Sequence, residues 1–171
     1  MGYRWYDEHN VSFTTGFPFG HGLSYSTFKL SCSAGVDDDE DSALVIAGAT
    51  AAPTTVTCQV SLASGPAGEE VLMVFHRVGA AIKAAAKHPV PMKELVGFER
   101  VHVSSGTAGS AEFKIGPNQM GLVDGKGNKQ LVKGEHHVDI TNGVDLTWSK
   151  TVAVAEAAVL VTVPPMPAPS A

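Results

Sequence analysis

The feature of this sequence that most constrains its fold is a series of short segments in which apolar and polar residues alternate. In residues 54–64, Val56, Cys58 and Val60 fall on one face of an extended chain, and polar side chains fall on the other. Residues 70–78 are apolar on both faces, which is typical of a central strand. The other segments with strand character are residues 27–33, 95–103, 111–115, 134–141 and 146–153.

Turn-forming residues separate these segments. Clusters of Gly, Pro, Asn, Asp and Ser occur at residues 64–66, 105–106, 116–118, 124–125 and 142–143. Short strands with this punctuation predict an all-β fold, a two-sheet sandwich of immunoglobulin or fibronectin type III-like form. One segment, residues 79–87, has good helix propensity and is predicted to be an insertion between strands. The residues expected to form the core are Phe28, Val60, Met73, Phe75, Phe113 and Val138.

Composition excludes two classes of protein. The chain has 171 residues, and 12 Lys and Arg against 17 Asp and Glu give a net charge of −5. No basic face for nucleic acid is expected from this balance. No apolar run approaches the ~18 residues of a spanning helix, so no membrane partner is expected either. The first residues are charged and aromatic, unlike a signal peptide, and the compartment stays unassigned.

Residues 1–25 hold seven of the 12 aromatic residues and show neither helical nor strand periodicity. Such a segment cannot bury its rings against itself, so it is expected to cover a surface of another domain. Without that domain, residues 1–13 are expected to be loosely held. The alternative is a platform on which sugar rings stack. The tail, residues 164–171, is rich in proline and is expected to be extended.

Cys32 and Cys58 allow two interpretations. If the first two strands pair antiparallel with these residues opposite each other, Leu30 meets Val60 and every core side chain faces another. The cysteines would then be close enough for a disulfide. The alternative is two free, buried thiols, which protein cores accommodate.

Other candidate sites are weaker. The acidic run at residues 37–41 offers oxygen ligands for Ca²⁺, but it lacks the spacing of a calcium loop and is interpreted as a solvated loop. His136 and His137 are adjacent on a strand, so they point to opposite faces and cannot chelate one metal together. Neither a metal site nor a cofactor is predicted. Asn10 begins an Asn-Val-Ser triplet that fits an N-glycosylation acceptor.

Four motifs, in order, resemble glycoside hydrolase family 3, the family of β-glucosidases and β-xylosidases. YRWYD at residues 3–7 and FPFGHGLSY at residues 17–25 are similar to its linker motif. GEEVLMVF at residues 68–75 and PMKELVGFERV at residues 91–101 resemble strands of its fibronectin type III-like domain. The wording GFERVH, together with GEH at residues 134–136, leans towards the β-xylosidase and α-arabinofuranosidase branch.

This resemblance implies a domain organisation and a function. Residues 1–25 would be the tail of an upstream catalytic region and linker, residues 26–163 the sandwich, and residues 164–171 a tail. The family's catalytic carboxylates lie upstream of the linker motif, so no catalytic residue is assigned in this chain, which is expected to be an accessory module of a secreted enzyme. The implied partner is the upstream catalytic region. The residues expected to dock against it are Trp5, Tyr6, Phe17, Phe19, His21 and Tyr25.

A second function remains open, namely an independent module that binds polysaccharide or another protein. The sandwich fold does not discriminate between the two, because it hosts many functions. The linker motif favours the accessory module, since a free binding module has no use for it.

Overall fold

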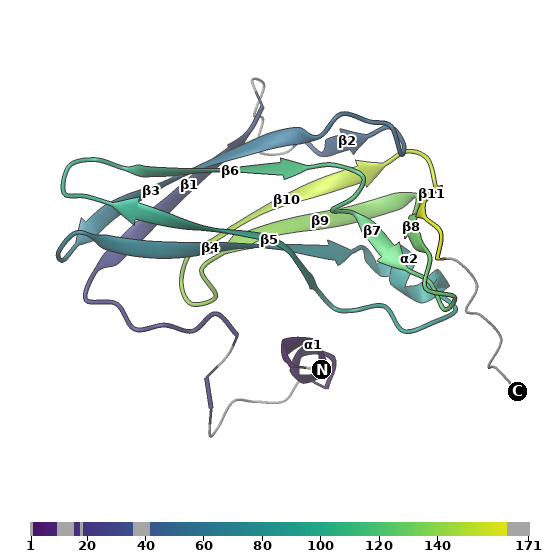
Figure 1. Ribbon diagram of the computed structural model, residues 1–171, viewed down its shortest axis with the longest axis horizontal. Coiled ribbons are helices and arrows are strands. Elements are labelled where there is room, and N and C mark those ends of the chain that lie inside the picture. Colours follow the sequence, from purple (N-terminus) through teal and green to yellow (C-terminus); the bar gives the residue numbers. More distant parts are fainter. Residues whose placement is uncertain (1, 10–15, 18, 36–41, 164–171) are drawn as a thin grey trace, which may run out of the picture.

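The computed structural model describes residues 2–9, 16–17, 19–35 and 42–163 (Figure 1). Strands dominate these residues, and two short helices, α1 (Tyr3–Glu8) and α2 (Ala80–Ala85), accompany them. The strands are β1 (Thr27–Ala34), β2 (Leu44–Ile46), β3 (Thr54–Ser64), β4 (Gly68–Val78), β5 (Glu94–Val103), β6 (Gly109–Ile115), β7 (Gly121–Val123), β8 (Lys129–Leu131), β9 (Gly134–Thr141), β10 (Thr147–Val154) and β11 (Ala158–Val161).

Two main sheets pack face to face. One has the strand order β1-β3-β6, and the other has the order β2-β10-β9-β4-β5. Neighbouring strands are antiparallel except β2 and β10, which are parallel. A small third sheet, β11-β8-β7, lies beside α2 at one end of the molecule (Figure 1). The predicted all-β, two-sheet sandwich is confirmed.

The core lies between the two main sheets and follows the alternation seen in the sequence. Val56, Cys58 and Val60 of β3 are fully buried and face residues such as Leu72 and Val138 of the opposite sheet. Polar neighbours on β3 point outward. Alternation dictates this arrangement, because successive side chains of a strand point to opposite faces of its sheet. Four of the expected core residues lie in this cluster, namely Phe28, Val60, Phe113 and Val138.

Strands β1 and β3 pair in the register considered from the sequence. Phe28 lies opposite Leu62, Leu30 opposite Val60, and Cys32 opposite Cys58. The two cysteines form a disulfide that closes 26 residues of sequence separation. This bond joins two strands of the same sheet beside the hydrophobic core.

Helix α2 forms inside the segment expected to be helical. The backbone N–H of Gly79 donates to the carbonyl of Glu135 at 2.8 Å, which fixes the start of the helix against β9. The helix ends before His88 and Pro89, since a residue before proline is disfavoured in helical conformation. Neither helix among the described residues is long and apolar enough to span a bilayer.

Candidate interdomain docking surface

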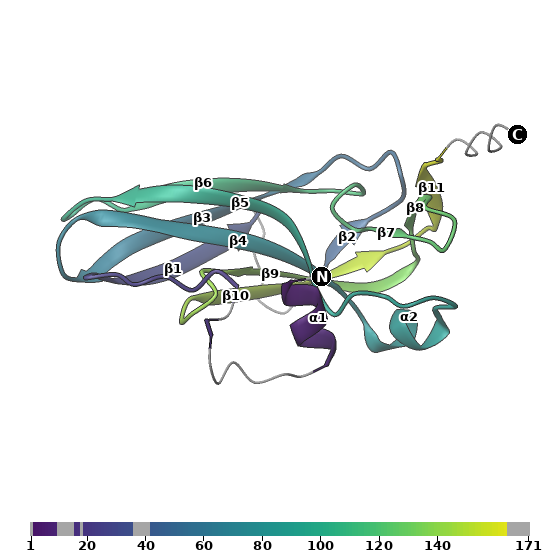
Figure 2. The same cartoon turned by 60° about the horizontal axis from the view of Figure 1, so that its bottom comes forward.

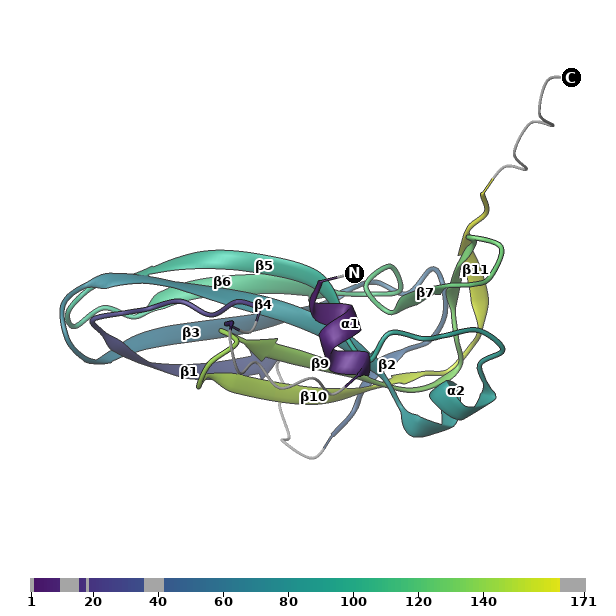
Figure 3. The same ribbon diagram turned by 90° about the horizontal axis from the view of Figure 1, so that it is seen from below.

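The described residues of the N-terminal segment, 2–9, 16–17 and 19–25, lie on the outer face of the five-stranded sheet, with α1 in front of it (Figures 2 and 3). The Tyr3 hydroxyl accepts a hydrogen bond from the backbone N–H of Leu95 at 2.7 Å. The Tyr3 ring packs edge-on against Phe75, with ring centroids 5.7 Å apart. Since Leu95 and Phe75 lie on paired strands, Tyr3 anchors the helix to both. Residues 3–8 are therefore held, and the expectation of a loose segment is wrong for them.

Ion pairs surround this anchor. Arg4 donates to Glu94 at 2.6 Å, and Lys93 lies 3.3 Å from Asp7 Oδ2. That oxygen is shielded from solvent and accepts no hydrogen bond in the described part of the chain, so the Lys93 ammonium is what balances its charge. These ion pairs are partly exposed, and pairs near the surface contribute about 0–1 kcal/mol each, so they orient the helix more than they stabilise it.

A glycine lets the segment approach the sheet closely after α1. Gly20 has φ +86°, and a Cβ on it would lie 2.2 Å from Met73 Cε. Gly143, in the turn between β9 and β10, has φ +83° and packs against the same methyl group. Both positions favour glycine, because L-residues with a side chain are strained at such φ, and at Gly20 a Cβ would also displace the Met73 methyl group.

The expected core role of Met73 and Phe75 is corrected by this packing. Both side chains are buried, but they lie on the outer face of β4, outside the cluster between the sheets. Phe75 lies beneath Tyr3 and Phe19, and Met73 lies beneath Gly20. Their neighbours Leu72 and Val74 fill the core instead. The sequence of β4 is apolar on both faces, so the alternation of apolar and polar residues does not show which face points to the core.

The opposite side of the segment carries apolar side chains that the described residues leave uncovered. Tyr25 is 98% exposed, Leu23 is 95% exposed and Phe17 is 75% exposed. Trp5, Tyr6 and Phe19 are each close to half exposed. We call this set the docking surface: Trp5, Tyr6, Phe17, Phe19, His21, Leu23 and Tyr25. Six of them are the residues predicted from the sequence. Leu23 was not predicted, although it lies in the same FPFGHGLSY motif.

Ring stacking orders parts of this surface. Phe17 stacks on His21 with centroids 4.5 Å apart, and Trp5 stacks on His9 at 4.4 Å. The Trp5 ring also meets Tyr6 edge-on at 5.3 Å. Contacts of this kind hold rings in fixed positions, which lowers the entropy lost when a partner binds them.

A polar cavity of about 550 Å³ opens beside the docking surface. It lies between residues 20–26, the start of β4 and the turn after β9. Glu69, Glu70 and Asp145 line it. Glu69 also pairs with Arg100 at 2.9 Å, and Asp145 accepts a hydrogen bond from Asn142. The cavity is acidic and adjoins exposed apolar groups.

The histidines expected on opposite faces of their strand do point apart. His136 is fully buried, whereas His137 lies at the outer face 3.2 Å from Glu135. Of the groups sharing that outer face, Asp139 is engaged by Arg77 and Ser149. Burial opposes ionisation of Asp139, but these hydrogen bonds outweigh it and hold the pKa of the carboxyl below its usual value. The described residues contain no group of three metal-ligating side chains.

The inner side holds a histidine pair that the sequence did not reveal. His136 Nε2 lies 2.7 Å from the carbonyl of Val132, so this nitrogen donates and His136 Nδ1 is left to accept from His76 Nε2 at 2.8 Å. Desolvation and the neighbouring His136 lower the pKa of His76 to about 3. Burial also lowers the pKa of His136. Both rings are therefore neutral at pH 7 and serve the packing of β4 against β9.

Three of the sites considered from the sequence lie outside the described residues. They are the glycosylation triplet at Asn10, the acidic run at residues 37–41 and the tail at residues 164–171.

The residues that anchor α1 were also missed, although both sides of the contact were visible as motifs. Tyr3, Arg4 and Asp7 belong to YRWYD, and their partners Lys93, Glu94 and Leu95 belong to PMKELVGFERV. Two motifs about 90 residues apart thus meet in space. Their co-occurrence was the available signal, but one sequence cannot show that two motifs touch.

Comparison with known proteins places this fold in a class. Residues 70–143 match the family described as "Fibronectin type III-like domain". The crystal structure of a β-glucosidase from Kluyveromyces marxianus in complex with glucose has the same fold, with a TM-score of 0.73 and 25% sequence identity. That match covers 94% of this chain and 18% of the yeast protein. The fold and its N-terminal segment thus define a fibronectin type III-like sandwich domain.

Sequence relatives point to the proteins in which this domain occurs. The chain is 36% identical over 115 residues to the probable β-glucosidase H of Aspergillus fumigatus. It is 30% identical over 116 residues to the thermostable β-glucosidase B of Acetivibrio thermocellus. Each match covers 67% of this chain, but the chain spans only 12% and 13% of those proteins. The chain thus contains a fibronectin type III-like domain and is similar to glycoside hydrolase family 3 β-glucosidases over their C-terminal region, as the motifs implied.

Proposed function

We propose that this chain is a non-catalytic accessory module, which braces the catalytic region of a glycoside hydrolase family 3 enzyme through its docking surface. The observation that carries the proposal is the two-sided N-terminal segment. One side is anchored to the sheet through Tyr3 and Gly20, while the other presents Phe17, Leu23 and Tyr25 to solvent. Exposed apolar patches of this kind mark protein interfaces.

The acidic cavity beside this surface supports the same role. Glu70 and Asp145 would receive an Arg or Lys side chain of the catalytic region, while the exposed rings fill apolar pockets there. Aromatic residues are the usual anchors of interfaces, and charged groups at the edge set orientation and register.

A brace rather than a catalyst also fits the state of the carboxylates. Retaining glycoside hydrolysis needs two carboxyl groups about 5–5.5 Å apart across a sugar cleft. Here Glu94 binds Arg4, Glu69 binds Arg100 and Asp139 binds Arg77. The parent enzyme would hydrolyse β-glucosides, the activity in the names of the relatives. The alternative substrates are β-xylosides, which the motif GFERVH favours because it resembles the β-xylosidase branch of the family.

A chimera tests the proposal. The matched C-terminal region of the Acetivibrio thermocellus β-glucosidase B is replaced by residues 1–163 of this chain, and the thermal stability and nitrophenyl β-glucoside hydrolysis of the chimera are measured. We expect an active chimera that melts several degrees lower when Phe17 and Tyr25 are both changed to Ser. Phe98→Ser is the matched control, because Phe98 is 68% exposed on β5, outside the docking surface. Equal effects of the two changes would contradict the proposal.

A sugar-binding module is the second candidate, because exposed rings are also surfaces on which pyranose rings stack. A pull-down of the isolated chain with insoluble xylan or cellulose separates the two functions. The accessory role predicts no retention on either polymer and no hydrolysis of nitrophenyl β-xyloside, β-glucoside or α-arabinofuranoside. Retention that is lost on changing Phe17 and Tyr25 to Ser would favour the sugar-binding module.

A further inference from the structure

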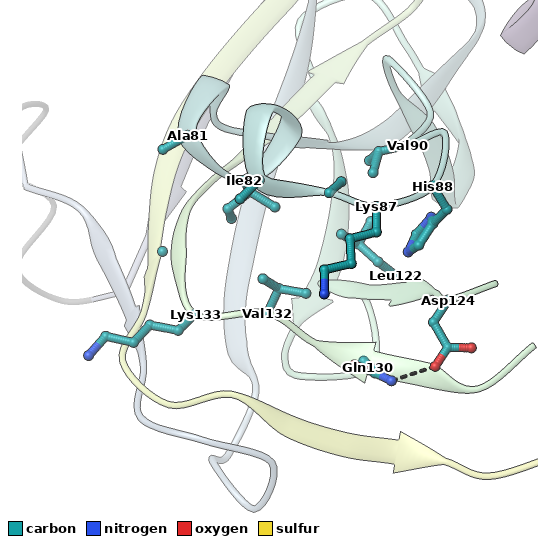
Figure 4. Close-up of a pocket in the computed structure, with 13 residues that line it drawn as sticks. Ala81, Ile82, Lys87, His88, Val90, Leu122, Asp124, Gln130, Val132 and Lys133 are labelled. Carbon is teal, nitrogen blue, oxygen red and sulfur yellow. Dashed lines mark hydrogen bonds between the residues drawn. The ribbon is translucent and has the colours of Figure 1, made fainter. Parts of the chain in front are cut away.

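Helix α2 and the β7–β8 hairpin enclose a cavity that the accessory role does not use. Its volume is about 470 Å³, within the ~300–1,000 Å³ typical of small-molecule sites (Figure 4). No residue of the docking surface lines it. Helix α2 forms one of its walls.

The walls of this cavity are apolar. Ile82, Val90 and Leu122 form a small buried cluster that is separate from the core of the sandwich, and Val132 packs against it. The face that α2 turns to the cavity otherwise consists of alanines, whose side chains are too short to fill the space. The cavity is thus a concave apolar site built on a helix and a hairpin.

One lysine of the lining points into this cavity. Figure 4 shows Lys87 and His88 pointing into the cavity and Lys133 pointing away from its centre. Lys87 makes no hydrogen bond or ion pair within the described part of the chain. An ammonium group next to apolar walls and without a counter-ion favours an anionic ligand group.

The one carboxylate in the lining is already committed to the hairpin. Asp124 accepts hydrogen bonds from the backbone N–H groups of Lys126 and Asn128 and from the side chains of Asn128 and Gln130. Desolvation opposes ionisation of Asp124, but these hydrogen bonds hold its pKa below the usual value. Asp124 therefore stays ionised within the turn, and no ion pair joins it to Lys87 in the described part of the chain.

We propose that this cavity binds a small amphipathic anion, a carboxylate on an alkyl or aryl body. The anionic group pairs with Lys87, and the apolar body lies between Ile82, Leu122 and Val132. A concave site of this size suits a free small molecule better than a flat protein surface. The proposal is independent of the accessory role, since the two use different residues.

Sodium octanoate is the probe, and 1-octanol is its uncharged counterpart. Titration calorimetry of the full chain is expected to give a Kd for octanoate of about 0.1–1 mM, from its size and the usual efficiency of small ligands. Backbone amide shifts in a ¹H–¹⁵N spectrum are expected at residues 81–87, 122 and 130–134. Shifts confined to residues 2–25, or no binding at millimolar octanoate, would overturn the proposal.

Two pairs of variants make the test specific. Ala85→Trp fills the cavity and is expected to weaken octanoate binding about tenfold or more, whereas Ala84→Trp, outside the cavity lining on the same helix, leaves it unchanged. Lys87→Gln is expected to weaken octanoate binding about tenfold and to leave octanol binding unchanged. Lys114→Gln, an exposed lysine on β6, is the control for charge.

Melting curves establish whether each variant is folded. If Ala85→Trp does not fold, the comparison of Lys87→Gln with Lys114→Gln tests the proposal. Equal weakening by Ala84→Trp and Ala85→Trp would overturn the proposal. So would equal binding of octanoate and octanol, because the ammonium group would then play no part.

Discussion

On one face of β4, Leu72 and Val74 pack against the opposite sheet, whereas on the other face Met73 and Phe75 lie beneath the N-terminal segment. The inner face is covered by the sheet β1-β3-β6. The outer face is closed by one short helix and one glycine turn, and the far side of that cover is exposed. A strand that is apolar on both faces therefore packs on both sides. The opposite sheet buries its inner face, whereas the segment that covers its outer face still exposes apolar side chains of its own.

The largest expected effect comes from placing a charge on the inner face. Val60→Asp buries a carboxylate without a partner at a fully buried position, so the domain is expected not to fold. Gln59→Asp is the matched change on the exposed face of the same strand, opposite Ser31 and Ser110, and is expected to be mild. Circular dichroism and thermal melting measure both. Similar melting temperatures would mean that the two faces of β3 are not distinct.

The disulfide is expected to have the next largest effect. Removing it by the double change Cys32→Ala and Cys58→Ala is expected to lower the free energy of unfolding by about 3–4 kcal/mol on the chain-entropy estimate, given the 26-residue separation. Urea titration of the oxidised chain and the double variant measures the difference. If the loss is below about 1 kcal/mol, chain entropy is not what this bond contributes.

Lowering the pH is expected to destabilise the domain first through a buried histidine on the inner face of β4. His76 is neutral when folded, with its pKa lowered to about 3, so the unfolded chain binds more protons as pH falls below about 6.5. Stability is therefore full above pH 6.5 and declines towards pH 3, with a loss of about 2 kcal/mol by pH 5. Urea midpoints between pH 7.5 and 5 measure this decline.

A variant assigns that decline to the histidine pair. His76→Gln is expected to reduce the dependence on pH and to leave the part that His136 contributes, and His102→Gln, at an exposed position on β5, is the control. An undiminished slope in the His76→Gln variant would assign the acid sensitivity to groups outside the histidine pair.

The smallest effect is expected at the cover of the outer face. Tyr3→Ala removes the ring over Phe75 and the hydrogen bond from Leu95, and it is expected to lower the free energy of unfolding by about 1–2 kcal/mol. Arg4→Ala, which removes only an exposed ion pair, is expected to change it by less than about 1 kcal/mol. Dye binding to apolar surface should rise in the Tyr3 variant. An unchanged melting temperature would mean that α1 contributes nothing to the outer face.

Alternation was sufficient to predict the inner face. The long strands and the core positions of Val60 and Val138 follow from the period of two residues. The register of β1 against β3 is compatible with that period but not fixed by it, because a shift by two residues leaves the same side chains on each face. Strands β2, β7, β8 and β11 escaped because three or four residues are too few to show a period. The helix within residues 79–87 could be predicted because alanine has an intrinsic preference for helical conformation.

The docking surface could be predicted only in part. Its residues were recognisable by their aromatic density and motif, but α1 was missed because its apolar residues show no helical spacing. The outer-face position of Met73 and Phe75 depends on contacts with residues more than 50 positions away in the chain. The histidine pair and the cavity beside α2 likewise arise from residues of separate elements. A pattern within one segment of the sequence does not predict contacts between segments.

The contact between Tyr3 and Leu95 joins residues 92 positions apart, and this separation has a consequence for the order of events during synthesis. At about 5–20 residues per second, the aromatic segment is made roughly 5–18 seconds before the strand that receives it. Throughout that interval its rings have no site on this domain. In the proposed accessory role, a catalytic region translated earlier would already be folded and able to bind them, so the segment would bind first to that region and only later to the sandwich. The same residues would then set the sequence of assembly as well as its final form.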